Sequence, residues 1–425
     1  MKTRSKKTHF LAYALLLIAL AGTASADVIS DWNAIGLQEA GLAGRQGGSP
    51  AIDLATMHAA MYDAVQAIAK NYEPYRVTDV PNTAGASPIA AAAKAARDVL
   101  VYRFSARASE INTRYLTYLG TNSIDEDDPG IAVGTYVAEK LLAYRSCDGS
   151  LPIPAPSFIG GTGIGQWRPT PSMAFPAMNP GPYLGQVTPF FMTRPTQFRP
   201  APPPAVNSNQ YTRDYNEVKA YGSKIGSLRS PDQTDLANFW AGNTFSAVYS
   251  GVRNVAGNNI DNVSDSSRLF ALVAMSMADT IIGVWDAKYH YNYWRPITAI
   301  RNGDADGNSE TVGDAAWESH IINPAYPDYT SGANGVSSSA MYSMEHFFET
   351  DSMAFSLTST SAAAIQNPRN YTTFSQAIQE VVDGRVLLGI HFRFADEASR
   401  ELGKNVAKWG FKNYLRPIRE RKPKT

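Results

Sequence analysis

Cysteine is almost absent from this sequence: Cys147 is the single example in 425 residues. A chain with one cysteine cannot form an intramolecular disulfide bond, so its stability must come from packing. No histidine lies near Cys147 in the sequence to activate the thiol as a nucleophile. The sequence therefore favours a structural role for this residue.

An excess of either charge is also absent, because 38 basic residues balance 38 acidic ones. Four of the basic residues lie in the first 26 positions, ahead of an apolar run at 10–22 and the small residues Ala24, Ser25 and Ala26. This order is typical of an export signal peptide, and the apolar run is too short to span a bilayer comfortably. We predict that residues 1–26 are removed and that the protein is periplasmic or secreted, without a stable membrane anchor.

Cleavage at this point would leave 34 basic and 38 acidic residues, a net charge of −4. Nucleic-acid-binding proteins usually carry a basic excess, so this balance argues against a nucleic-acid partner. The basic stretch RPIRERKPKT at 416–425 has the composition of a solvated tail.

Strand-like alternation is scarce, whereas helical spacing of apolar residues recurs along most of the chain. Ser-Pro pairs at 49–50 and 87–88 are typical of helix starts, and Ser230 with Gln233 forms a capping-box pattern. We predict an all-α fold of helical bundles in which residues 27–425 form a single domain. The expected helices begin at or near residues 49, 87, 108, 131, 214, 230, 264, 331 and 394, and a further helix ends near residue 388.

Proline is unevenly distributed, because residues 151–204 hold 14 of the 26 prolines. This segment also carries Trp167 and several phenylalanine and tyrosine residues, which a disordered linker would lack. We expect an ordered segment that wraps the surface of one domain.

The segment ADTIIGVWDAKYHYNYWRPITAIR, residues 278–301, places two cations in an apolar and aromatic sequence. We expect it to lie in one long helix from 264 to about 300, with a kink or an end near Pro296. In such a helix Lys288 and Arg295 are seven residues apart and leave the same face. A buried cation needs an anion, and no carboxylate lies at a matching spacing between them. The negative charge must therefore come from outside the helix.

Two later segments add groups that bind anions. YPDYTSGANG contains Ser331, with its hydroxyl, and Gly332, whose N–H lies at an expected helix start where unpaired N–H groups bind anions. DGRVLLGIHFRF contains Arg385 and His391. With the two earlier cations, these groups suit a tetrahedral oxyanion such as phosphate or vanadate. Imidazole can bond the central atom, as a nucleophile to phosphorus or as a ligand to vanadium.

Three motifs carry a family resemblance: K-x6-R-P at 288–296, Y-x-S-G at 329–332 and R-x5-H-F at 385–392. In this order they resemble the signature motifs of vanadium-dependent haloperoxidases, which share a helical fold with type 2 phosphatidic acid phosphatases and bacterial class A acid phosphatases. GIHFRF is similar to the haloperoxidase branch, and LATMHAAMYDAV at 54–65 resembles the N-terminal half of bacterial members.

The resemblance implies a vanadate cofactor, at a site that phosphate can also occupy, and halide oxidation by hydrogen peroxide. The partners would be hydrogen peroxide and a halide or small organic substrate. The implied cofactor-binding residues, all within 288–396, are Lys288, Arg295, Ser331, Gly332, Arg385 and His391. The cations would neutralise the oxyanion, the hydroxyl and the N–H would bond its oxygens, and His391, the implied catalytic residue, would ligate vanadium.

The sequence departs from the family pattern at two positions. The family usually has an acid–base histidine directly after Ser-Gly, whereas this chain has Ala333 followed by Asn334. The family also often places an aspartate four residues after the ligating histidine, to orient its ring. Here that residue is Ala395, and Asp396 one position later would point from a different face of a helix.

Other histidines and other functions stay open at this level. His290 and His320 are candidates for the missing proton donor, although His290 would lie on the wrong face of a straight helix. One alternative is a phosphatase that acts through a phospho-histidine at His391. The other is a non-catalytic oxyanion binder, which Ala333 favours.

The remaining polar features have simpler interpretations. His58, within an apolar helix, and His346, beside two phenylalanines, are expected to be structural. The stretch at 304–318 partly matches a calcium loop, but its glycine is misplaced and its twelfth position is Ala315, so a polar turn is favoured. The many apolar helices are compatible with a homodimer.

Overall fold

The computed structural model describes residues 27–153, 158–171 and 181–418. The predicted signal peptide at 1–26 lies outside the described residues, as do two stretches of the proline-rich segment and the end of the basic tail. The fold class is confirmed: the described chain is mostly helical, and its helices form bundles.

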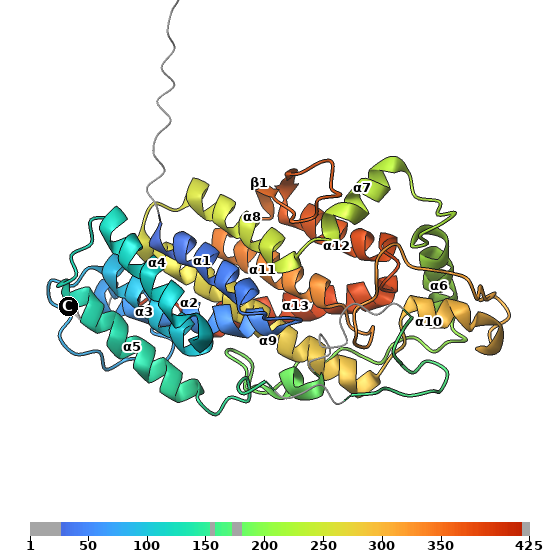
Figure 1. Ribbon diagram of the computed structural model, residues 1–425, viewed down its shortest axis with the longest axis horizontal. Coiled ribbons are helices and arrows are strands. Elements are labelled where there is room, and N and C mark those ends of the chain that lie inside the picture. The colour runs from blue at the N-terminus through green and yellow to red at the C-terminus, as the bar shows by residue number, and fades with distance from the viewer. Residues whose placement is uncertain (1–26, 154–157, 172–180, 419–425) are drawn as a thin grey trace, which may run out of the picture.

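The first bundle forms one end of an elongated molecule (Figure 1). Its helices are α1 (Val28–Leu42), α2 (Ser49–Ala69), α3 (Pro88–Arg103), α4 (Ala108–Thr121) and α5 (Pro129–Arg145). Helix α2 packs against α1 and α3, and α3 packs against α4 and α5. Figure 1 shows α6 and α10 at the opposite end.

The second half of the chain contributes the remaining helices. They are α6 (Asn209–Tyr221), α7 (Pro231–Trp240), α8 (Thr244–Asn259), α9 (Val263–Tyr291), α10 (Pro296–Arg301), α11 (Gly332–Phe348), α12 (Phe374–Leu387) and α13 (Arg393–Asn413). Helix α11 packs against α9, α12 and α13, and α9 also packs against α2 of the first bundle. Helix α9 therefore joins the two halves.

Helix α9 is buried along most of its length. It is the one described helix that is long and apolar enough to cross a membrane, and 94% of its most apolar window is covered by other parts of the protein. A helix that is apolar on all sides is expected to be buried in this way at the centre of a bundle.

Two glycines allow α9, α11 and α13 to approach one another closely. A Cβ atom at Gly335 of α11 would lie 2.8 Å from Thr280 of α9 and 2.7 Å from the Ser399 hydroxyl of α13. A Cβ atom at Gly403 of α13 would lie 2.7 Å from the Gly335 carbonyl oxygen. Larger residues at these two positions would push α11 away from its neighbours and shift its first turn.

The helix starts follow the predicted capping residues with one exception. The Ser87 side chain caps α3, and Ser230 and Gln233 form the predicted capping box of α7. The expectation that Ser49 caps α2 was wrong: the N-cap is Gly48, and the Ser49 hydroxyl donates to a carbonyl in the preceding loop.

The predicted helix over 264–300 is interrupted. Helix α9 ends at Tyr291, Asn292 adopts a left-handed conformation with φ of 48°, and Pro296 is the first residue of α10. The Asn292 carbonyl accepts a hydrogen bond at 2.8 Å from the backbone N–H of Trp167. A distant segment therefore pairs with the chain at the point where the helix was expected to continue.

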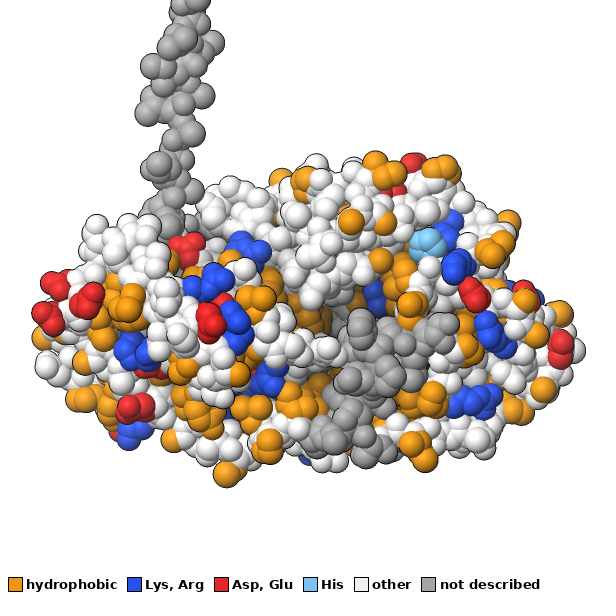
Figure 2. All heavy atoms as spheres, viewed as in Figure 1, with side chains coloured by type: hydrophobic (Ala, Val, Ile, Leu, Met, Phe, Trp, Pro, Cys, Tyr) orange, Lys and Arg blue, Asp and Glu red, His pale blue; other side chains and the backbone are white. Residues whose placement is uncertain are grey.

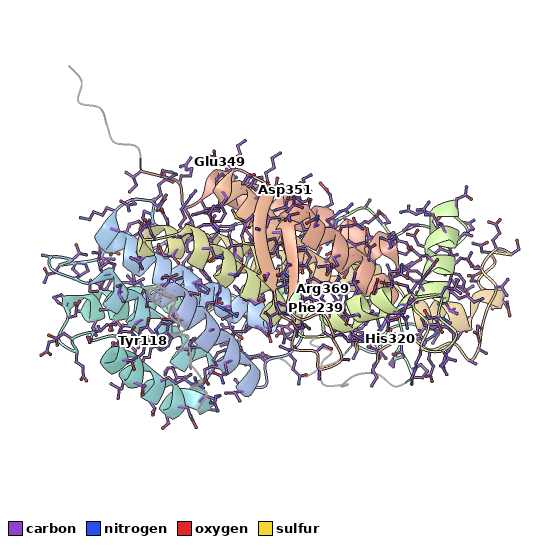
Figure 3. All side chains as sticks on the ribbon, turned by 90° about the horizontal axis from the view of Figure 1, so that it is seen from above. Tyr118, Phe239, His320, Glu349, Asp351 and Arg369 are labelled. Atoms are coloured by element: carbon purple, nitrogen blue, oxygen red, sulfur yellow. The ribbon has the colours of Figure 1, made fainter. Side chains whose placement is uncertain are left out.

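A hairpin of β1 (Ser352–Leu357) and β2 (Arg369–Thr373) was not predicted. Its two short antiparallel strands cover neighbouring helices at the surface, where apolar alternation is weak. The Arg369 guanidinium lies 5.8 Å from the centre of the Phe239 ring of α7, and both residues are labelled in Figure 3. This contact ties the hairpin to the helical core.

The described parts of the proline-rich segment lie against α9. The Asp279 carboxylate accepts hydrogen bonds from the backbone N–H groups of Phe190, Phe191 and Met192 at 2.6, 2.8 and 2.6 Å. Burial raises the pKa of Asp279 to about 6, and these N–H groups oppose that shift. The described residues of the segment are ordered in the way that their aromatic content predicted.

The surface mixes charges of both signs. Figure 2 shows Lys and Arg side chains interspersed with Asp and Glu on this face. Some charges pair across long distances in the sequence: Arg416, near the described C-terminus, binds the Glu73 carboxylate at 2.9 and 3.1 Å. The mixed surface agrees with the balanced composition.

Candidate oxyanion site

Lys288 lies in the last turn of α9 and is completely buried. Its Nζ donates to the backbone carbonyls of Pro327 and Asp328 at 2.8 and 2.9 Å. Burial lowers the pKa of Lys288 well below its usual value, Arg295 lowers it further, and Asp328 opposes the shift. An anion bound nearby would favour the charged form of this lysine.

Arg295 precedes α10 as its N-cap and is also completely buried. Its guanidinium donates to the carbonyls of Tyr326 at 3.0 Å and Ile390 at 2.7 Å, and it lies 3.6 Å from an Asp328 oxygen. The prediction that Lys288 and Arg295 leave one face of one helix was therefore wrong. They meet because the loop before α11 runs past both.

Arg385 lies in the last turn of α12 and is partly exposed. Its Nη1 donates to the Trp240 carbonyl at 2.9 Å, whereas its Nε is buried without a hydrogen-bond partner among the described residues. The guanidinium therefore keeps a free donor.

His391 lies in the turn between α12 and α13. Its Nδ1 is 2.7 Å from Asp328 Oδ1, and its Nε2 is 3.3 Å from Arg295 Nη1. Burial lowers the pKa of His391 well below its usual value, and Arg295, Lys288 and Arg385 lower it further. The lowered pKa favours the neutral ring, which can bond an electrophile or a metal through a nitrogen lone pair.

Asp328 is the site residue that the sequence did not reveal. Burial raises its pKa to about 7, and Arg295, Lys288 and the Phe392 N–H oppose that shift. It takes the orienting position next to His391 that was considered for Asp396. Its place beside the Y-x-S-G motif was a hint, but no spacing rule links it to a histidine more than sixty residues later.

Ser331 and Gly332 form the start of α11. Ser331 is the N-cap, and its side chain makes no capping bond, so the first-turn N–H groups remain for a ligand. A Cβ atom on Gly332 would come no closer than 3.6 Å to any neighbour, which is Trp285. The Gly332 backbone also lines a cavity.

The structure thus brings the six predicted residues together from four helix ends and a turn. The group, here called the cradle, consists of Lys288, Arg295, Ser331, Gly332, Arg385 and His391. Free donors on two of its elements and a neutral imidazole suit a bound oxyanion. The described residues contain no group of three or more His, Cys, Asp and Glu side chains that could hold a metal cation directly.

Comparison with known proteins agrees with this chemistry. A family model of the VCPO second helical-bundle domain matches residues 268–420, which contain the whole cradle. The vanadium chloroperoxidase of Curvularia inaequalis is 26% identical over 182 residues, which cover 36% of this chain and 30% of that protein. Residues 268–420 are therefore similar in sequence to the second helical-bundle domain of vanadium chloroperoxidase. The match spans less than a third of the length of the fungal relative.

Solved structures extend the likeness in fold to the first bundle. A bacterial vanadium-dependent iodoperoxidase superposes with a TM-score of 0.77 and 23% identity, covering 93% of this chain and 98% of its own. A holo-type bacterial vanadium-dependent chloroperoxidase superposes with a TM-score of 0.69 and 14% identity, covering 87% and 92%. At these identities the likeness concerns the fold.

A cavity of 360 Å³ opens beside the cradle. Its walls come from both halves of the molecule and include Arg45, Phe245, Trp285, Tyr326, Ala333 and Arg385. Among the described residues that line it, arginine is the only charged type. The cavity thus gives an anion or a small substrate access to the cradle.

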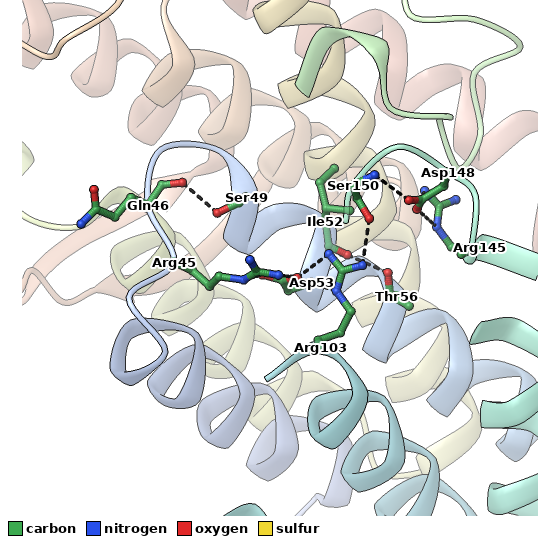
Figure 4. Close-up of polar contacts among 10 residues, drawn as sticks. All are labelled: Arg45, Gln46, Ser49, Ile52, Asp53, Thr56, Arg103, Arg145, Asp148 and Ser150. Atoms are coloured by element: carbon green, nitrogen blue, oxygen red, sulfur yellow. Dashed lines mark hydrogen bonds and ion pairs between the residues drawn. The ribbon is translucent and has the colours of Figure 1, made fainter. Parts of the chain in front are cut away.

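Arg45 belongs to a network of charges in the first bundle, drawn in Figure 4. Its guanidinium binds Asp53 at 2.8 and 2.9 Å, and Arg103 binds the same carboxylate at 2.6 Å and the Ser150 hydroxyl at 2.8 Å. Two arginines share one aspartate, so a net positive charge remains behind this wall of the cavity.

Ala333 points toward the cavity and supplies no proton donor. The two histidines considered as alternative proton donors, His290 and His320, are exposed or bonded to other residues. His320 contacts Arg229 at 3.1 Å and Asn238 at 2.9 Å, and His290 is exposed at the end of α9. Neither contacts the cradle.

The other polar residues singled out in the sequence lie away from the cradle. His58 is buried with its Nε2 3.0 Å from Asn33, and His346 stacks on Phe411. In the calcium-like loop, Asp306 accepts hydrogen bonds from within its own turn. Cys147 is a free cysteine at the surface, which differs from the structural role expected for it.

Proposed function

We propose that this protein is a vanadium-dependent haloperoxidase that oxidises halide with hydrogen peroxide at a vanadate held in the cradle. The observation that carries the proposal is the state of His391. Its Nδ1 lies 2.7 Å from Asp328 Oδ1, its Nε2 lies 3.3 Å from Arg295 Nη1, and burial beside the cations lowers its pKa well below the usual value. Bound vanadate would supply a Lewis-acid centre for oxygen transfer from peroxide to halide.

The chain's own residues would hold and orient the cofactor. His391 Nε2 would bond vanadium, while Lys288, Arg295 and Arg385 would neutralise the oxygens. Ser331 and the Gly332 N–H would donate hydrogen bonds at the start of α11. Asp328 would keep the imidazole in the tautomer that leaves Nε2 free.

Vanadate titration of the mature protein, after removal of phosphate, tests the proposal. The assays are bromination of an activated diketone and oxidation of iodide, each with hydrogen peroxide. The sample without vanadate is assayed for hydrolysis of p-nitrophenyl phosphate. We expect halide oxidation that depends on vanadate, is lost in His391→Ala and is retained in His290→Ala, which alters an exposed ring.

The other outcomes identify the alternatives. Hydrolysis of the phosphate ester that is lost in His391→Ala would show the phosphatase reaction instead. Vanadate binding without either activity would show an oxyanion binder.

A further inference from the structure

The region behind Ser331 contains a buried carboxyl group that the cradle does not use. Asp396, in the first turns of α13, is completely buried. Its Oδ1 accepts a hydrogen bond from Asn334 Nδ2 at 2.7 Å, and its Oδ2 has no hydrogen-bond partner among the described residues. Asn334 Nδ2 also lies 3.5 Å from the Ser331 hydroxyl, and the Asp396 carboxyl lies beside that hydroxyl.

Asp396 is surrounded by charged and polar groups from the neighbouring elements. Three cations act on it: Lys288 from α9, Arg295 from the start of α10 and Arg385 from the end of α12. One like charge acts on it, Asp328 from the loop before α11. Ser331 and Asn334 of α11 are the polar neutral groups that contact it.

We propose that Asp396 is a positioning residue that stores a proton and passes it through the Ser331 hydroxyl, in place of the acid–base histidine that this chain lacks at Ala333. The inference rests on the proposed haloperoxidase function. Asn334 Nδ2 holds one carboxyl oxygen and also lies 3.5 Å from the Ser331 hydroxyl, so it keeps the carboxyl beside that hydroxyl.

The reaction itself requires this proton. Oxidation of halide follows X⁻ + H2O2 + H⁺ → HOX + H2O, in which the halide loses two electrons and the peroxide O–O bond breaks. The departing oxygen leaves as water only after gaining a proton. Ser331 would give its hydroxyl proton to that oxygen and take the Asp396 proton in return, leaving a carboxylate that is protonated again before the next turnover.

Burial supports a protonated carboxyl at this position. It raises the pKa of Asp396 well above the usual value, while Ser331, Arg385 and Asn334 oppose that shift. In its neutral form Asp396 accommodates an anion in the cradle, and in its ionised form it repels one. Anion affinity due to Asp396 is therefore present at low pH and is lost as the pH rises through the pKa of this group.

The test compares Asp396→Asn with the wild type in two measurements. The first is the dissociation constant of inorganic phosphate and of orthovanadate between pH 5 and 9. We expect Asp396→Asn to bind both anions and to show a flatter decline in affinity at high pH, because the amide stays neutral. The second is halide oxidation at saturating vanadate, which should fall about 100-fold because the amide cannot transfer a proton.

Two further variants separate this role from a structural one. Asn334→Ala removes a hydrogen bond that lowers the pKa of Asp396, so the decline in phosphate affinity should move to higher pH. Asp214→Asn neutralises another buried carboxylate, which accepts from the Phe394 N–H at the start of α13, and should leave both measurements unchanged. Ala333→His added to Asp396→Asn should restore turnover at least in part.

The following results with Asp396→Asn and the wild type would contradict the proposal. Full turnover in Asp396→Asn, or equal loss of phosphate affinity at every pH, would show that Asp396 only supports the fold. If the wild type itself oxidises no halide, the proposed function fails, and the phosphate measurements still decide whether Asp396 holds a proton beside the cradle.

Discussion

At the scale of single residues, the His391 ring has a defined orientation. Asp328 lies against one ring nitrogen and Arg295 against the other. Second contacts of this kind hold a ligating histidine in one tautomer and raise its basicity. The motifs were enough to predict that Lys288, Arg295 and His391 lie in one cluster. The contact between Asp328 and His391 could be identified only from the folded structure.

We predict that Asp328→Asn weakens vanadate binding about 10- to 100-fold, because the amide holds the imidazole less firmly and leaves a less basic Nε2. Titration with orthovanadate measures the change. Asp383→Asn, at a more exposed carboxylate that pairs with Arg393, is the control and should bind as the wild type does. Equal vanadate affinities in Asp328→Asn and the wild type would show that Asp328 does not support vanadate binding.

His58 gives a second prediction at this scale. Burial lowers its pKa to about 3, well below the unfolded value, so the neutral ring contributes stability above pH 6.5 that is lost as the pH falls. Between pH 6.5 and 4.5 the loss is about 2.5 kcal/mol.

In His58→Gln the free energy of unfolding should therefore fall less over this range, as measured by urea denaturation at each pH. His290→Gln, at an exposed position, is the control and should keep the slope of the wild type. The same slope in His58→Gln and the wild type would mean that His58 is not neutral in the folded protein.

At the scale of elements, helix starts were easier to predict than helix ends. The capping residues of α3 and α7 are local, so Ser87 and Ser230 could be recognised from their neighbours in sequence. The end of α9 depends on pairing with residues 165–167, more than a hundred positions away. The β1–β2 hairpin was missed for a similar reason: its short strands pack against helices, including α8 and α12, rather than in a larger sheet.

Asp279 of α9 anchors the proline-rich segment, and its loss should be costly. We predict that Asp279→Asn lowers the free energy of unfolding by about 2–4 kcal/mol, because an amide N–H would face three backbone N–H donors. Asp286→Asn is the matched control on the same helix. It breaks a more exposed ion pair with Arg199 of the same segment and should cost less than about 1 kcal/mol.

Chemical denaturation monitored by tryptophan fluorescence compares these two variants. Equal effects would show that the buried carboxylate does not anchor the segment.

At the scale of the whole molecule, one large apolar cluster extends through both halves, and a second cluster lies around Tyr211, Trp294 and Phe392. A continuous cluster of buried apolar residues runs from Val28 in α1 to Leu415 after α13. The cavity beside the cradle likewise takes walls from both halves. That residues 27–425 form a single domain stays a prediction, which thermal unfolding can test.

We therefore predict one thermal unfolding transition, whose calorimetric and van't Hoff enthalpies are equal. Asp63→Asn in the first bundle and Asp279→Asn in α9 should lower the midpoint of this same transition. Two separate transitions, each sensitive to one variant only, would show that the halves unfold independently.

The sequence by itself determined the helical class, the capped helix starts and the residues that could hold an oxyanion, because these depend on local spacing and on side-chain chemistry. The tertiary structure decided how the cations meet, which carboxylate faces His391 and which lies behind Ser331. Those relations depend on backbone turns and on contacts between distant segments. Lys288 and Arg295 illustrate the difference. Their charge could be recognised in the sequence, but α9 ends between them at the left-handed Asn292, and both cations bind the loop before α11.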